Sequence, residues 1–148
     1  MSNVVQDEPT EKETIEYNEI TKIEQQAQKA YNEKDWVAAE AAYQKLVENL
    51  RQESEPWFRL GNVYTRTNRP DEAIYAYQQS LNINPNNTKA WNNLGVTQLR
   101  QATNTFVNMQ QHMHIDNPLN DRVNNVVEVM TDLMENGFNS NDQTKTNE

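Results

Sequence analysis

Residues 54–87 read SEPWFRLGNVYTRTNRPDEAIYAYQQSLNINPNN, and this stretch decides the fold. Its parts recur 34 positions away in both directions along the chain. The first half recurs downstream, where Trp57, Leu60, Gly61 and Arg66 are followed by Trp91, Leu94, Gly95 and Arg100. The second half recurs upstream, where Ala73, Ala76, Tyr77 and Gln78 are preceded by Ala39, Ala42, Tyr43 and Gln44. Large and small residues that repeat in register predict stacked helix pairs rather than one amphipathic helix.

The pattern W-x2-L-G-x2-Y, then A-x3-[FY], then P resembles the tetratricopeptide repeat family. The middle unit supplies nearly every position of it: Trp57, Leu60, Gly61, Tyr64, Ala73, Tyr77 and Pro85, with Ser80 where alanine is usual. Gly61 and Ala73 are small where two helices must cross closely. The resemblance covers residues 20 to about 118, and it implies an all-α, right-handed solenoid of about three helical hairpins.

The flanking units keep only half of the pattern each. In residues 20–53 the second helix is faithful, and the first helix should begin near Thr14 because apolar residues keep helical spacing from there. In residues 88–118 the first helix keeps its Trp, Leu and Gly, whereas Phe106 or Val107 stands where alanine is expected. The register of that second helix is left open.

A further helix is predicted from Pro118 to Glu135. Asn117 is a suitable N-cap, Pro118 suits the first helical position, and Gly137 suits a left-handed C-cap with Phe138 against Leu133. This helix should cap the solenoid, or else pair with another molecule. The expected organisation is a disordered acidic tail (1–13), the repeats (14–118, as 20–53, 54–87 and 88–118), a capping helix (119–137) and a disordered polar tail (138–148).

The net charge of −9 lies in the tails. Residues 1–19 and 116–148 each carry a charge of −5, whereas residues 54–115 carry +2. Such a balance excludes nucleic acid or an anionic membrane as the main partner, because phosphate binding needs a surplus of Lys and Arg. Without cysteine, no disulfide, thiolate metal site or cysteine nucleophile can form. We expect no direct membrane insertion, because no apolar run approaches the roughly 20 residues that span a bilayer.

The sequence leaves two cellular locations open. As it stands, the sequence predicts a cytoplasmic protein. Its acidic, Ser/Asn-rich start also resembles a mature bacterial lipoprotein just after the lipidated cysteine, which would make the protein periplasmic or lipid-anchored in the envelope.

The resemblance implies that the first helix of each repeat lines a concave groove for a peptide or a partner helix. By position, the groove should contain Glu24, Gln28, Tyr31, Phe58, Asn62, Thr65, Arg66, Lys89, Asn92, Val96, Leu99 and Arg100. Arg66 and Arg100 occupy equivalent places and could bind the carboxylates of an acidic ligand, or they could pair with local acids such as Glu55. The clamp that some members use for chaperone tails is not expected, because only Lys89 survives of its five positions.

The sequence is compatible with three functions. The favoured one is a non-enzymatic adaptor or scaffold, which in small bacterial members of the family commonly assists assembly of envelope machinery. The first alternative is a structural protein that self-assembles head to tail through its terminal helices. The second is an enzymatic or metal-binding role, which would rest on His112 and His114; two residues apart on a helix they diverge, but an extended segment would align them with Asp116. No catalytic residues, metal or cofactor are predicted.

Overall fold

The computed structural model describes residues 8 and 10–137, and every element in them is helical. The predicted polar tail 138–148 and most of the tail 1–13 lie outside these residues. Six α-helices are followed by one π-helical turn: α1 (Glu11–Asn32), α2 (Trp36–Asn49), α3 (Ser54–Arg66), α4 (Pro70–Ile83), α5 (Thr88–His112), α6 (Asn120–Asp132) and η1 (Leu133–Gly137).

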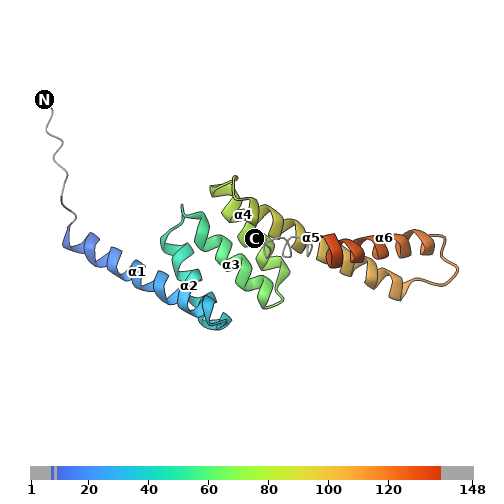
Figure 1. The fold of residues 1–148 in the computed structure, drawn as a ribbon, viewed down its shortest axis with the longest axis horizontal. Coiled ribbons are helices and arrows are strands. Elements are labelled where there is room, and N and C mark those ends of the chain that lie inside the picture. Colours follow the sequence, from blue (N-terminus) through green and yellow to red (C-terminus); the bar gives the residue numbers. More distant parts are fainter. Residues whose placement is uncertain (1–7, 9, 138–148) are drawn as a thin grey trace, which may run out of the picture. The chain divides into compact units, whose positions relative to one another are not determined.

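The chain divides into two units between Asn86 and Asn87. In the first unit α1 packs on α2, α2 on α3 and α3 on α4, so consecutive helices lie side by side (Figure 1). In the second unit α5 packs on α6 (Figure 1). The three successive helix pairs confirm the predicted all-α fold of the tetratricopeptide type.

Helix α1 begins three residues before the predicted start at Thr14. Thr10 is its N-cap, and its side chain accepts a hydrogen bond from the backbone N–H of Glu13 at 3.3 Å. The Glu13 carboxylate accepts in return from the Thr10 N–H at 2.8 Å, which completes a capping box and lowers the pKa of Glu13. Residues 11–13 are therefore helical, whereas the prediction placed them in a disordered tail.

Two residues with left-handed backbone end the first helices of the first two pairs. Lys34 has φ of 60° and Asn68 has φ of 57°, and they stand one repeat length apart. After Lys34, the side chain of Asp35 accepts from the N–H of Ala38 at 3.1 Å and starts α2. After Asn68, Pro70 occupies the first position of α4, where its missing N–H costs nothing. These local signals make each chain reversal.

The α3–α4 pair packs at the glycine of the repeat pattern. A Cβ placed on Gly61 would lie 2.5 Å from Cε1 of Tyr77, a distance that real Cβ atoms do not tolerate. Tyr77 is 1% exposed, and Ala73 beside it on α4 is fully buried. The prediction that small residues are needed at this crossing is confirmed for Gly61. Ser80 is also fully buried, and its hydroxyl has no hydrogen-bond partner among the described residues.

The third unit of the repeat does not fold as a hairpin of its own. Helix α5 runs without a break from Thr88 to His112, through the place where the second predicted helix should begin. Ala102 stands one repeat length after Asn68, and Asn104 stands one repeat length after Pro70. Alanine has the highest helix propensity and avoids left-handed backbone, so nothing at this point ends the helix.

The partner of α5 is instead the helix that was predicted as a cap. The amide of Gln110 donates to the Asn124 side chain at 2.8 Å, and the hydroxyl of Thr103 lies 3.9 Å from the sulfur of Met134. Val123 of α6 is 4% exposed. The helix predicted as a terminal cap is therefore packed as the second half of the third pair.

The ends of this last helix differ from the prediction. Asn117 does accept a backbone hydrogen bond, from the N–H of Leu119 at 2.9 Å, but it caps a turn and the helix begins at Asn120 rather than at Pro118. At the other end Gly137 closes a π-helical turn, and no described glycine has the positive φ of a left-handed cap. The predicted contact of Phe138 lies outside the described residues.

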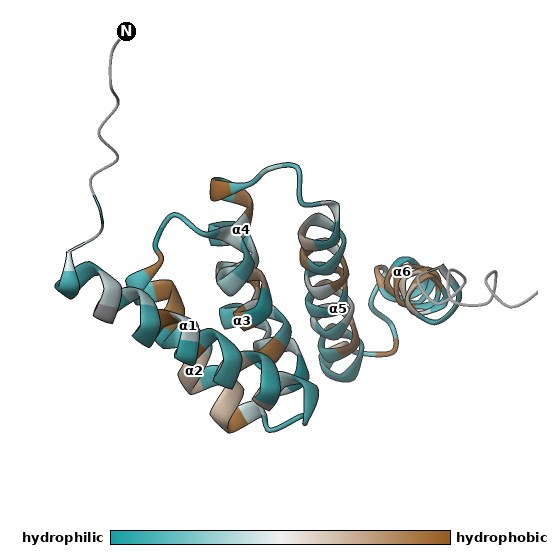
Figure 2. Ribbon diagram, turned by 60° about the vertical axis from the view of Figure 1, so that its left-hand side comes forward, coloured by the Kyte–Doolittle hydropathy of each residue, from teal (hydrophilic) through white to brown (hydrophobic). Residues whose placement is uncertain are grey.

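Hydrophobic and hydrophilic residues alternate along the helices, and none of them is hydrophobic throughout (Figure 2). Among the described residues, no helix combines the length and the apolar character that crossing a membrane requires.

Two equivalent glycines allow a matched test of the helix crossing. Gly61→Ala forces a methyl group onto the Tyr77 ring, so we expect it to lower the free energy of unfolding by about 1–3 kcal/mol. Gly95, one repeat length later, has open space around a built Cβ, so Gly95→Ala should raise stability by about 1 kcal/mol through helix propensity. Chemical denaturation followed by circular dichroism measures both. Equal effects of the two substitutions would contradict the close crossing at Gly61.

Candidate functional site

Helices α1, α2 and the start of α3 enclose a groove of about 610 Å³, which we call the α1–α3 groove. Its apolar lining includes Tyr17, Ile20, Leu46, Leu50 and Pro56. Its polar lining includes Glu24, Gln28, Glu53, Glu55 and Arg59. A groove of this size with mixed lining can take side chains of a peptide or a helix.

Arg59 holds the α3 side of this groove. Its Nε lies 2.7 Å from the Glu55 carboxylate one turn earlier, and its guanidinium lies 5.3 Å from the centre of the Tyr31 ring on α1. Burial lowers the pKa of Arg59, but the hydrogen bond and the charge of Glu55 raise it by more, so the group stays charged. Tyr31 also makes edge-to-face contacts with Trp36 at 5.5 Å and with Tyr43 at 6.2 Å. These contacts hold both walls in place.

The structure brings three of the predicted groove residues together. Glu24, Gln28 and Tyr31 all line the α1–α3 groove, and they reach it from successive turns of α1. Their grouping in the structure agrees with their position in the repeat. Their role in binding stays a prediction.

The predicted residues of α3 belong mainly to the interior. Phe58 is 7% exposed and lies 6.1 Å from the Tyr77 ring. The Tyr77 hydroxyl donates to the Asn62 side chain at 2.8 Å and lies 3.0 Å from the hydroxyl of Thr65. Phe58, Asn62 and Thr65 therefore position Tyr77, and none of them lines the α1–α3 groove.

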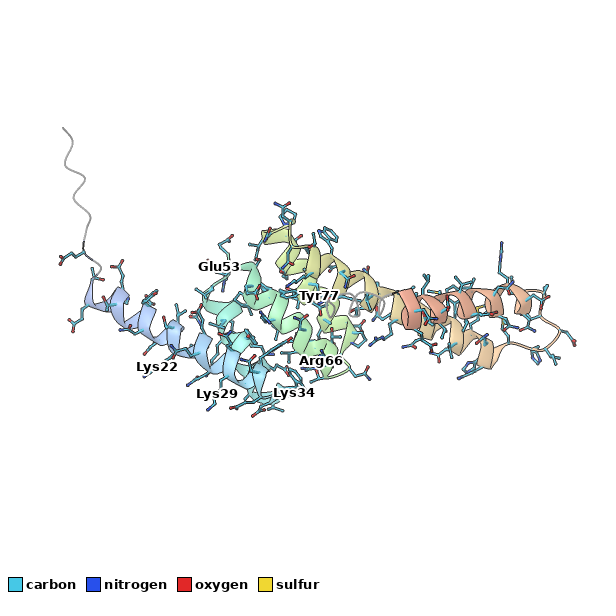
Figure 3. The ribbon with its side chains drawn as sticks, viewed as in Figure 1. Lys22, Lys29, Lys34, Glu53, Arg66 and Tyr77 are labelled. Carbon is cyan, nitrogen blue, oxygen red and sulfur yellow. The ribbon has the colours of Figure 1, made fainter. Side chains whose placement is uncertain are left out.

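Arg66 and Arg100, the two arginines predicted to line the groove, lie in different units. Arg66 is the last residue of α3, at the opposite end from Glu53 (Figure 3), and it is exposed. Glu55, suggested as its local partner, pairs with Arg59 instead. Arg100 lies within α5 and is exposed.

The other predicted groove residues of the second unit also lie on α5. Lys89 and Asn92 are exposed, whereas Val96 and Leu99 are half-buried. A single groove that joins them to α1 and α3 stays a prediction.

Position within the repeat missed several residues of the observed groove. Tyr17 lies ahead of the first repeat as predicted, within the part of α1 that the sequence already predicted as helical, and it lines the groove. Its place seven residues before Glu24, two helical turns earlier on the same face, was the signal that could have identified it. Arg59 faces a neighbouring helix, which only packing can reveal.

The two histidines do not form part of a metal cluster among the described residues. His112 ends α5 and its Nδ1 lies 2.8 Å from the Asn108 carbonyl oxygen, whereas His114 lies beyond the helix end. In the described part of the chain no group of three or more His, Cys, Asp or Glu side chains could hold a metal ion.

The helices form successive pairs, Gly61 lies at a close helix crossing, and equivalent turns stand 34 residues apart. These features define a helical-hairpin repeat protein. Comparison with known families agrees, since the model described as TPR repeat matches residues 55–101. Residues 55–101 are therefore similar to the TPR repeat family, whose repeats generally mediate protein–protein interaction and are typically not enzymes. No curated protein matches the chain.

A substitution at Tyr77 tests the hydrogen bonds that join its hydroxyl to Asn62 and Thr65 of α3. Tyr77→Phe removes the hydroxyl that donates to Asn62 and pairs with Thr65, so we expect it to lower the free energy of unfolding by about 1–2 kcal/mol. Tyr75→Phe on the same helix is the control, because Tyr75 is 55% exposed and should tolerate the change. Urea denaturation measures both variants. A Tyr77→Phe variant as stable as Tyr75→Phe would contradict the importance of this network.

Proposed function

We propose that the protein is a non-enzymatic adaptor whose α1–α3 groove binds a peptide or a helix of a partner protein. The observation that carries the proposal is the groove itself, about 610 Å³ in volume and lined by apolar side chains between charged ones. The match of residues 55–101 to the TPR repeat family supports it, because TPR repeats bind other proteins. The contact between Arg59 and Tyr31 holds the two walls in place before a ligand binds. Little conformational entropy is then lost on binding, which favours affinity.

The charge of the groove indicates the chemistry of its ligand. Glu24, Glu53 and Glu55 line it against one base, Arg59, which already pairs with Glu55. Such a lining favours a ligand that places apolar side chains on Ile20 and Leu50 and neutral or basic groups at the rim. It does not favour the acidic ligand that Arg66 and Arg100 suggested. The assembly of bacterial envelope machinery is the narrower role that we retain as a prediction.

Site-specific photocrosslinking tests the groove. We expect p-benzoylphenylalanine at Gln28, which lines the groove, to give discrete crosslinks to a partner protein in cells of the source organism. The same group at Gln78, exposed on α4 and outside the groove, is the control and should give none of these products. Mass spectrometry of the products identifies the partner. Identical products from both positions would contradict binding in this groove.

A substitution in the groove extends this test. Tyr17 is 71% exposed and lines the groove, so Tyr17→Ala should remove ligand contacts and reduce the Gln28 crosslinks several-fold without loss of fold. Val37 is 82% exposed on α2 and lies outside the groove, which makes Val37→Ala the matched control. Unfolding curves of both variants should overlay that of the wild type.

Self-association is the second candidate function, and the second unit favours it. Five large apolar side chains of its described residues are exposed: Ile115 (91%), Val129 (58%), Trp91 (53%), Leu133 (45%) and Leu119 (42%). Apolar groups exposed on one small unit are typical of contact surfaces. A second copy of the chain could cover them.

Light scattering over a concentration series tests self-association. We expect the molar mass to rise with concentration, and Val129→Ser/Leu133→Ser to return it to the monomer value, because both substitutions remove apolar contact area. Val37→Ser is the control for a change of exposed apolar surface elsewhere. A constant monomer mass of the wild type would contradict self-association.

A further inference from the structure

A second groove lies between α2 and α4 and has α3 as its floor; we call it the α2–α4 groove. Its volume is about 640 Å³, and it shares no lining residue with the α1–α3 groove. The floor consists of buried apolar side chains, Val47 of α2 with Leu60 and Tyr64 of α3. The predicted concave surface of first helices does not include it.

Two aromatic side chains form one wall of this groove. Trp57 of α3 and Tyr75 of α4 meet edge to face, with ring centres 5.9 Å apart and planes at 78°. Tyr75 remains 55% exposed although it is a large aromatic residue in a packed helix pair. An edge-to-face pair leaves a ring face open, and ring faces attract cations.

Carboxylates form the rim. Glu48 comes from the end of α2, and Asp71 and Glu72 come from the first turn of α4. No lysine or arginine lines the groove. Neither Glu48 nor Glu72 takes part in a salt bridge among the described residues. The lining therefore combines an aromatic wall with negative charge.

The protein shows this combination beside the groove, at Tyr64, which lines the groove floor, although Arg69 itself is not a lining residue. The Arg69 guanidinium lies 4.5 Å from the centre of the Tyr64 ring and forms an ion pair with Glu40 of α2. The hydrogen bond with Glu40 raises the pKa of Arg69. One aromatic ring and one carboxylate thus suffice to hold a guanidinium here. The larger part of the groove has two more aromatic side chains, Trp57 and Tyr75, and the carboxylates of Glu48 and Glu72 for a cation from outside.

We propose that the α2–α4 groove binds an arginine side chain of a partner protein, with a neighbouring apolar residue of the partner on the floor formed by Val47 and Leu60. Arginine fits better than lysine because its planar guanidinium can stack on Trp57 or Tyr75 while it donates to Glu48 and Glu72. This binding is independent of the α1–α3 groove, so either proposal can fail without the other.

A peptide titration of the ¹⁵N-labelled full chain tests the inference. The probe is acetyl-Leu-Arg-Leu-amide at low ionic strength, and the reporter is the indole N–H resonance of Trp57, assigned with the Trp57→Phe variant. We expect a saturable shift of this resonance with an affinity on the order of millimolar, as befits three residues. Acetyl-Leu-Glu-Leu-amide should leave the resonance in place, because the carboxylate rim repels it.

Matched charge variants separate the groove from the net charge. Glu48→Gln/Glu72→Gln removes two carboxylates from the α2–α4 groove and should weaken binding at least about fivefold. Glu24→Gln/Glu53→Gln removes the same charge from the α1–α3 groove and should change it less than about twofold. The proposal is overturned if Trp57 does not respond, if the acidic peptide shifts it equally, or if both double variants weaken binding alike.

Discussion

The ring of Tyr77 lies against the backbone of α3 at Gly61, at a distance that no side chain on residue 61 would allow. This contact sets how closely α3 and α4 pack, and other features follow from it. The Tyr77 hydroxyl is placed to bind Asn62 and Thr65, and its ring packs on Phe58. With these residues turned toward α4, other positions of α3 face its remaining neighbours. Arg59 lies beside α1 in the α1–α3 groove. Trp57 makes a further contact with α4, through Tyr75 in the α2–α4 groove.

Chain reversals decide where this packing can repeat. Lys34 and Asn68 adopt left-handed backbone one repeat length apart, and each is followed by a residue suited to start a helix. The next equivalent position holds Ala102, and there α5 continues for 25 residues in all. The Trp-Leu-Gly signature of the third repeat is therefore present without the hairpin that it normally accompanies. At Gly95, no described neighbour lies within 4 Å of a Cβ built on the backbone.

The two grooves illustrate how a repeat fold acquires binding surfaces. Helix α3 contributes to both, and the packing of α1 and α2 on one side and of α2 and α4 on the other encloses them. Each groove is lined by three aromatic residues, but only the α1–α3 groove has a basic side chain, Arg59, in its lining. An adaptor with two separate grooves in one unit could hold two segments of a partner, which raises affinity through effective concentration.

The sequence by itself determined the first two helical hairpins, their period of 34 residues and the need for a small residue at Gly61, because a close helix crossing restricts residue size at a few positions. Position within the repeat also placed Glu24, Gln28 and Tyr31 on one side of α1, and in the structure all three line the α1–α3 groove. Only the tertiary structure decided that Asn62 and Thr65 serve Tyr77 and that Arg59 lies over Tyr31. It also decided that α6 pairs with α5. These outcomes depend on contacts between residues far apart in the chain. The neighbouring helix, and not the spacing of residues along one helix, determines which side chain fills a given space in the interior.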